Sequence, residues 1–375
     1  MKGRTTFALA ALALAALGSC APRGISLSVE SEAPSLAPTV AALAREWGKA
    51  RGLEIEVSKA AEPAAKALAG ARVVIKWMLA PETDRKDAAA LIVPAADRAE
   101  IALAFSRWAG ASAGASADAS ADASAGAWRA VPLLWDAWGL VGTPEELLRF
   151  GPGETADASA LAESGMRGGS VAAAMGEAGT RQTIFWLAAG TGAASIVPDL
   201  SDPTRLLASS AGALGRLSAY SKPPTFAPGM ERWLKADLEN YARSFGPALV
   251  LGPYSWTRTL GQGGRRDFRP LASKGDKASS VIVAVLAGEV EAKANSPGAA
   301  EAAELLLFLL GKESQARLSY ATGLLPVRLD APNLDPPSAA ARAAALDAAS
   351  ILPVDPEPGR GGRFEAWLHA IDAAF

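Results

Sequence analysis

The sequence predicts an α/β fold of two lobes, each built on a mostly parallel sheet flanked by helices. The chain has 375 residues, of which 50% are hydrophobic and 20% charged, and this length is enough for two separate hydrophobic cores. Segments with strand periodicity alternate with segments of helix periodicity through residues 25–78. Such alternation is typical of parallel sheets whose crossover helices cover the faces.

The N-terminus has the pattern of an export signal. Two basic residues precede an apolar run from Phe7 to Leu17, which is too short to span a bilayer. Leu17-Gly18-Ser19-Cys20 resembles a bacterial lipobox, which implies a lipoprotein signal over residues 1–20, a lipidated Cys20 and an extracytoplasmic, membrane-anchored protein. Because Cys20 is the only cysteine, no intramolecular disulfide can form. An ordinary signal peptide that ends near a cysteine is the alternative.

Three strands and two helices are expected early in the first lobe. Apolar residues alternate with polar ones in Ile25–Glu30 and Leu53–Ser58, while Arg72–Met78 contains the continuous apolar run of a strand buried on both faces. An amphipathic helix is expected between Ser35 and Gly52, and a second over Glu62–Ala69.

Two residues near predicted strand ends are candidate ligand-binding residues. In parallel α/β sheets, ligands bind beyond the carboxyl ends of the strands. Glu32 follows the first strand, and Trp77 lies at the end of the third. A carboxylate and a flat aromatic face are the groups that bind the hydroxyls and the C–H face of a sugar ring.

Residues 109–127 form a low-complexity stretch of alanine, serine, glycine and aspartate. Without large apolar side chains it cannot build a core, so we expect a disordered surface insert in the first lobe. Its Gly110-Ala111-Ser112-Ala113-Gly114 matches the G-x-S-x-G nucleophile elbow by letter. The strand and helix that should flank such an elbow are missing, so the match predicts no hydrolase.

Further elements are expected in the rest of the chain. The strands are Ser170–Met175, Ala248–Leu251, Ser279–Leu286 and Glu289–Lys293. The helices are Arg181–Ala189, a longer helix from Asp202, Met230–Phe245, and Phe364–Phe375. A helix pair follows Ser296, with Gly311 expected in the left-handed conformation between the two helices and Gly323 at the end of the second.

Three segments carry a resemblance to a known family. Trp128–Gly142 contains a Pro-hydrophobic-hydrophobic-x-acidic-x-x-x-Leu pattern with its fixed positions at Pro132, Asp136 and Leu140. Gly252–Trp256 has the sequence Gly-Pro-Tyr-Ser-Trp, and Ala299–Arg328 contains two adjacent helices followed by Thr-Gly-Leu-Leu-Pro-Val. In this order they resemble the family 1 extracellular solute-binding proteins of ABC importers, the group that includes maltose-binding protein. The resemblance implies a periplasmic-binding-protein-like fold of type II.

The resemblance also implies a ligand site. It implies that Asp136 accepts hydrogen bonds from sugar hydroxyls, that Tyr254 stacks on a sugar ring and that Trp256 supplies a second aromatic face. Trp367, in the last helix, is a further candidate for covering the ligand. The chain departs from the family where two aromatics and an asparagine often follow, since it has Val141-Gly142-Thr143 there. Trp135 and Trp138 are each equally compatible with packing and with ligand contact.

The predicted division into lobes follows from the same resemblance. The first lobe comprises residues 24–136 and 262–312, and the second comprises residues 137–261 and 313–375. The lobes are expected to close on a ligand about Asp136–Leu140 and Ser255–Leu260.

Other classes of function are disfavoured by the residues that the chain lacks. It has no basic stripe for nucleic acid and no P-loop for ATP hydrolysis. His369 is the only histidine, so a zinc site of the usual Cys/His kind cannot be assembled. We therefore expect no enzyme, no metal and no cofactor, although a carboxylate pair for glycoside cleavage depends on the fold and stays open.

The sequence thus predicts a monomeric, lipid-anchored solute-binding protein that delivers a sugar or oligosaccharide to an ABC permease and its separate ATPase. Two alternatives remain. One is a binder of another small solute, such as a polyamine or ferric ion. The other is a surface lipoprotein that has the same fold but acts as a sensor or adhesin.

Overall fold

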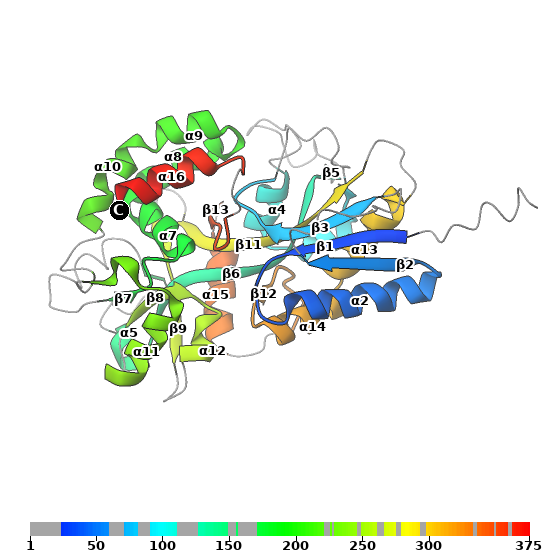
Figure 1. The fold of residues 1–375 in the computed structure, drawn as a ribbon, viewed down its shortest axis with the longest axis horizontal. Coiled ribbons are helices and arrows are strands. Elements are labelled where there is room, and N and C mark those ends of the chain that lie inside the picture. Colours follow the sequence, from blue (N-terminus) through cyan, green and yellow to red (C-terminus); the bar gives the residue numbers. More distant parts are fainter. Residues whose placement is uncertain are drawn as a thin grey trace, which may run out of the picture.

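The computed structural model describes residues 24–59, 71–81, 91–110, 127–148, 155–156, 171–220, 226, 229–245, 249–260, 266–274, 279–292, 298–332, 336–348, 350–358 and 362–375. The predictions for the export signal with Cys20, the helix over 62–69 and residues 111–126 of the insert lie outside these residues, as does Ser296, which precedes the predicted helix pair. The described residues confirm the predicted α/β class, with two lobes joined by long strands (Figure 1).

The first lobe contains β1 (Gly24–Glu30), β2 (Glu54–Lys59) and β3 (Arg72–Trp77), which pair in parallel in the order β2-β1-β3. Helix α2 (Leu36–Arg51) connects β1 to β2 and buries its apolar side. The helix ends at Gly52, whose φ of 67° is left-handed, a conformation that glycine adopts without steric cost. These elements confirm the three predicted strands and the first predicted helix.

Strand β6 (Ala130–Gly142) runs from the first lobe into the second and is buried along its whole length. Its first part pairs antiparallel with β11, ending at the pair Trp135 and Val285. Its last part pairs with β8 (Val250–Pro253), starting at Trp138 and Pro253. The change of partner falls at Asp136 and Ala137.

Strand β11 (Ser279–Glu291) is a single strand where two were expected. It pairs antiparallel with β3 and β6 near its end and in parallel with β13 (Ser350–Val354) near its start. The expected interruption between Leu286 and Glu289 does not occur, although the pairing with β6 shifts register between Leu286 and Ala287. Gly288 lies within the continuous strand. A Cβ there would lie 2.4 Å from a methyl carbon of Leu306, so the strand continues while the leucine fills the space above it.

The second lobe is built around β7 (Ala172–Ala173) and β8, which pair in parallel, and β9 (Asp267–Pro270), which pairs with the end of β6. Helices gather on one side of these strands, with the C-terminal helix among them (Figure 1). They are α7 (Ala178–Ala189), α8 (Ala193–Ile196), α9 (Pro203–Ser209), α10 (Ala211–Tyr220) and α16 (Glu365–Ala374). Short 3-10 turns are η2 (Gly190–Gly192), η3 (Val197–Ser201) and η4 (Met230–Arg232).

The remaining strands are short: β4 (Leu91–Ile92), β5 (Ala127–Trp128), β10 (Ala272–Lys274) and β12 (Leu325–Pro326). The remaining helices are α3 (Ala95–Ala99), α4 (Leu103–Gly110), α5 (Pro144–Leu148), α11 (Lys235–Phe245), α12 (Trp256–Leu260), α13 (Ala299–Leu310), α14 (Lys312–Thr322) and α15 (Pro336–Asp347). The leucine stripe of α13 is buried, and α13 and α14 both pack against α2.

Two helix ends differ from the prediction. Gly311 has φ −59° and ψ 148°, not the expected left-handed conformation, because α14 starts directly after α13 and the residue between them is extended. The long helix expected from Asp202 is divided at Ser210, whose hydroxyl donates to the carbonyl of Leu206 at 2.6 Å. Bonds of this kind compete with the helical ladder and bend helices.

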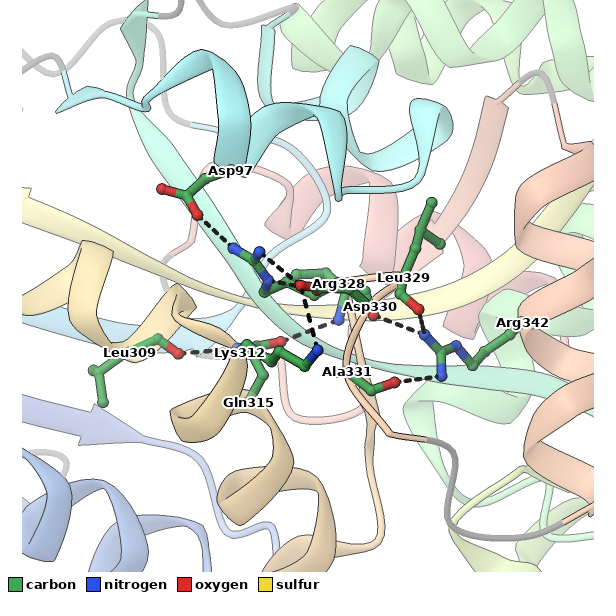
Figure 2. Close-up of polar contacts among 10 residues, drawn as sticks. Asp97, Leu309, Lys312, Gln315, Arg328, Leu329, Asp330, Ala331 and Arg342 are labelled. Atoms are coloured by element: carbon green, nitrogen blue, oxygen red, sulfur yellow. Dashed lines mark hydrogen bonds and ion pairs between the residues drawn. The ribbon is translucent and has the colours of Figure 1, made fainter.

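Arg328, a buried arginine that follows β12, holds the chain in place through ion pairs with two aspartates (Figure 2). The Arg328 guanidinium, 8% exposed, binds Asp97 of α3 at 2.6 Å and Asp330 at 2.8 and 3.1 Å. Arg342 of α15 donates to the carbonyl oxygens of Arg328 and Leu329 at 2.8 and 2.6 Å, and it also binds the carbonyl of Ala331. The segment that leaves α14 and β12 is therefore held by side chains from α3 and α15.

Candidate functional site

A cavity of about 290 Å³ lies where β6 changes partner, and we call it the central cavity. Its lining comes from the ends of β1, β3 and β8, from the middle of β6, and from the first residues of α7, α11 and α12. The polar and aromatic side chains in this lining are Glu32, Trp77, Asp136, Trp138, Glu177, Lys235, Ser255, Trp256, Thr322 and Glu357.

Asp136 lies at the floor of the central cavity and is 5% exposed. One carboxylate oxygen accepts a hydrogen bond from the backbone N–H of Ser255 at 3.0 Å. Burial raises the pKa of Asp136 to about 7, although hydrogen bonds from Ser255 and the charge of Lys235 act in the opposite direction. A carboxyl group with this pKa changes its charge close to neutral pH.

Three indole rings border the central cavity. Trp77 ends β3, Trp138 lies in β6 and Trp256 starts α12. The rings of Trp138 and Trp256 are 6.2 Å apart with an interplanar angle of 58°. Among the described residues, the indole nitrogens of Trp77 and Trp138 have no hydrogen-bond partner. The cavity wall is thus aromatic on several sides, and the N–H groups of two of its indoles are buried without a partner in the part of the chain that the structure describes.

Three further carboxylates come from three different parts of the chain. Glu177 directly precedes α7 and accepts the backbone N–H of Lys235 at 2.9 Å. Glu357 follows β13 and accepts the backbone N–H of Glu32 at 2.8 Å and the hydroxyl of Ser31 at 3.3 Å. These bonds hold the carboxylates of Glu177 and Glu357 in place without neutralising their charge, and the third carboxylate is that of Glu32.

Four of the six residues predicted to bind ligand line the central cavity, namely Glu32, Trp77, Asp136 and Trp256. Tyr254 does not, because its ring is 2% exposed and packs edge-on against Phe268 at 5.5 Å. Trp367 does not either. It is fully buried beside Phe185, and its indole nitrogen donates to the Ser210 hydroxyl at 3.0 Å.

The alternation of β6 separates the two tryptophans that the sequence left undecided. Side chains two apart on a strand point to the same face, so Trp138 shares the face of Asp136 and lines the cavity. Trp135 points to the opposite face, packs against Phe105 at 5.2 Å and donates to the carbonyl of Pro326.

Sequence reasoning did not single out Glu177, Lys235 or Glu357 as site residues. The sequence gives little sign of their role. Glu177 precedes α7, Lys235 starts α11 and Glu357 follows β13, and polar residues are ordinary at such positions. Only the fold brings the start of α7, the start of α11 and the end of β13 to one cavity.

No protein-family model matches the chain, and no curated protein matches it. Solved structures do match. A cyclo/maltodextrin-binding protein in complex with maltotetraose has a TM-score of 0.62 and 16% identity, over 94% of this chain and 96% of the other. A putative binding protein of Bacillus subtilis in an open conformation has a TM-score of 0.65 and 12% identity, over 95% and 94%.

The chain has the two-lobed α/β fold of these binding proteins. The same fold also occurs in an enzyme, thiaminase I from Bacillus thiaminolyticus, with a TM-score of 0.60 and 14% identity over 94% of this chain and 98% of the other. A fold shared between binders and an enzyme does not by itself decide the activity, so the function has to be argued from the site.

The described residues contain no group of three or more His, Cys, Asp or Glu side chains that could hold a metal ion. Within the described part of the chain, no helix is both long and apolar enough to cross a membrane.

Proposed function

We propose that the chain is an extracytoplasmic solute-binding lipoprotein of an ABC importer, and that it binds a sugar or oligosaccharide in the central cavity without catalysis. The observation that carries the proposal is the composition of the cavity wall, where three indoles stand beside four carboxyl groups. Aromatic faces bind the apolar face of a sugar ring, and carboxylates accept its hydroxyls.

The position of the cavity supports a closing motion. It lies at the residues where β6 leaves its pairing with β11 and joins β8, so elements of both lobes contribute to one wall. Closure of two lobes about a ligand is a known transition of periplasmic binding proteins. We place the hinge at Asp136–Leu140 and Ser255–Leu260, and α14 with the first lobe because it packs against α2.

We further propose that Cys20 carries the lipid anchor, that the protein acts as a monomer, and that a permease with its own ATPase takes up the bound solute. The predicted lobe boundaries, 24–136 plus 262–312 and 137–261 plus 313–375, are proposed with two changes: α14 as given above, and β9, which pairs with the end of β6 and is assigned to the second lobe. Asp136, Trp77, Trp256 and Glu32 are the proposed ligand contacts, joined by Trp138.

A thermal-shift screen of the purified protein tests the proposal. The panel contains maltotetraose, other neutral oligosaccharides, amino-sugar oligosaccharides, polyamines, ferric citrate and thiamine, with product analysis after each incubation. A ligand at a hundred times its dissociation constant stabilises a protein by about 2.7 kcal/mol. Stabilisation by one carbohydrate class without turnover supports the proposal. Stabilisation by a metal complex alone, turnover of any compound, or a folded protein that responds to nothing contradicts it, and the last result favours the sensor or adhesin.

A further inference from the structure

The charges around the central cavity are unbalanced. Its lining contains four acidic side chains and one lysine. The lysine is already engaged, because the Lys235 ammonium lies 3.8 Å from Glu239 on its own helix and 5.7 Å from the centre of the Trp256 ring. No ion pair within 4 Å joins Glu32, Glu177 or Glu357 to a basic side chain of the described residues.

The lining also contains more acceptors than donors. The three glutamate carboxylates only accept hydrogen bonds. The hydroxyls that could donate are occupied, and the indole N–H groups of Trp77 and Trp138, which have no partner within the described ranges, are buried. The Thr322 hydroxyl donates to the carbonyl of Leu318 at 2.7 Å, and Ser255 is hydrogen-bonded to Asp136. A ligand that fills this cavity therefore has to supply donors, and it meets an excess of negative charge.

Aromatic rings beside such carboxylates favour one chemical group in particular. The faces of tryptophan rings attract cations, and the attraction grows as water is removed. A cavity lined by one sign of charge raises the local concentration of ligands of the opposite sign. An ammonium group, which has three donors and no acceptor, satisfies both the ring faces and the unpaired carboxylates.

We infer that the solute bound in the central cavity is a carbohydrate that carries a protonated amine, with Glu177 and Glu357 as the carboxylates that receive the ammonium group. This inference rests on the proposed function and narrows it from sugars in general to amino sugars. The two glutamates are selected because their backbone hydrogen bonds hold them in place before any ligand arrives.

The test uses three disaccharides with the same β-1,4 skeleton: cellobiose, its N-acetylated 2-amino analogue chitobiose, and the free-amine glucosamine disaccharide. Spermidine serves as an amine without a sugar. Affinities are measured by calorimetry for the wild-type protein and for Glu177→Gln and Glu357→Gln, which keep an acceptor for the backbone N–H and remove the charge. Glu313→Gln is the matched control, because Glu313 is exposed at the start of α14 and does not line the cavity.

We expect the free-amine disaccharide to bind at least about tenfold more tightly than cellobiose, with the preference falling as salt is added. Each cavity variant should lose most of that preference without weakening cellobiose, and Glu313→Gln should retain it. Equal or tighter binding of cellobiose or chitobiose overturns the inference and leaves the proposed function standing. If spermidine binds and none of the disaccharides does, the ligand is not a carbohydrate, which overturns both the inference and the proposed function. No binding at all overturns both.

Discussion

Glu357 and Glu32, 325 residues apart in the sequence, are joined by a hydrogen bond of 2.8 Å from the backbone N–H of Glu32 to the Glu357 carboxylate. Glu32 follows β1 of the first lobe. Glu357 follows β13, whose next residues are tied to the second lobe because the backbone of Asp355 makes two hydrogen bonds with the Gln182 side chain of α7. The pair therefore links the lobes across the mouth of the central cavity.

Replacing Glu357 with alanine should expose the amide of Glu32. We expect faster hydrogen exchange at that amide in Glu357→Ala, because the carboxylate that accepts its hydrogen bond is removed, with a small loss of global stability of about 1 kcal/mol or less. Glu357→Gln should protect the amide, since its side-chain oxygen still accepts. Exchange at Glu32 that is identical in the wild type and Glu357→Ala would contradict the link.

The buried carboxyl of Asp136 should make stability depend on pH. Its pKa is raised to about 7, so the folded state holds a proton that the unfolded chain has lost. Stability contributed by this proton is full below the unfolded pKa and is lost as the pH rises through the folded pKa. The side-chain oxygen in Asp136→Asn can still accept the hydrogen bond from Ser255 but does not titrate. This variant should therefore not lose stability as the pH rises through about 7.

The measurement is urea unfolding of the wild type and Asp136→Asn at about pH 5 and about pH 8. The free energy of unfolding of Asp136→Asn should exceed that of the wild type by more at the higher pH, and the pH-dependent part of this difference is on the order of 4 kcal/mol at most. Glu313→Gln serves as the control for removal of a charge at the surface. A gain that is equal at both pH values would show that Asp136 is ionised throughout.

The Arg328 cluster predicts the opposite pH response. Hydrogen bonds and the charge of Arg328 lower the pKa of Asp330, so this carboxylate stabilises the fold above its unfolded pKa and loses its contribution as the pH falls. Asp330→Asn should cost about 2 kcal/mol at neutral pH, because it leaves a buried guanidinium with Asp97 as its remaining carboxylate. At about pH 3 the difference from the wild type should shrink. Chemical unfolding at both pH values checks this, and a constant difference would refute it.

A single methyl group at Gly179 should disturb the cavity. A Cβ at this position would lie 2.5 Å from a ring carbon of Trp138 and 3.3 Å from Cα of Pro356. Because an indole cannot bend away, Gly179→Ala should cost about 1–3 kcal/mol and shift Trp138. We expect weaker ligand binding and altered tryptophan fluorescence. Gly215→Ala, with open space around its Cβ, is the matched control and should bind normally. Normal binding in Gly179→Ala would remove Trp138 from the proposed site.

Local signals in the sequence predict most of the fold. The strands around α2 have periodic patterns, Gly52 and Gly323 take the left-handed conformation at helix ends, and Asp202 caps α9 through hydrogen bonds to Thr204 and Arg205. The errors occur where tertiary packing decides the local conformation. Two strands were expected over Ser279–Lys293, but they form one strand in the sheet, in which Gly288 makes room for Leu306.

The site is less predictable for the same reason. Asp136 and Trp256 lie in segments with a recognisable pattern, whereas Glu177 and Glu357 reach the cavity only through the packing of α7 and β13. The Gly252–Trp256 motif correctly indicates an aromatic residue at Tyr254, but it does not show to which side the ring points. In the structure the ring packs against Phe268 and not into the cavity.

The change of partners along β6 has a consequence for how the molecule unfolds. Strand β6 pairs with β11 in the first lobe and with β8 in the second. Strand β11 likewise pairs with β3 at one end and with β13 at the other. Neither lobe can therefore keep its complete sheet when the other comes apart. We therefore expect the two lobes to unfold together as a single cooperative unit.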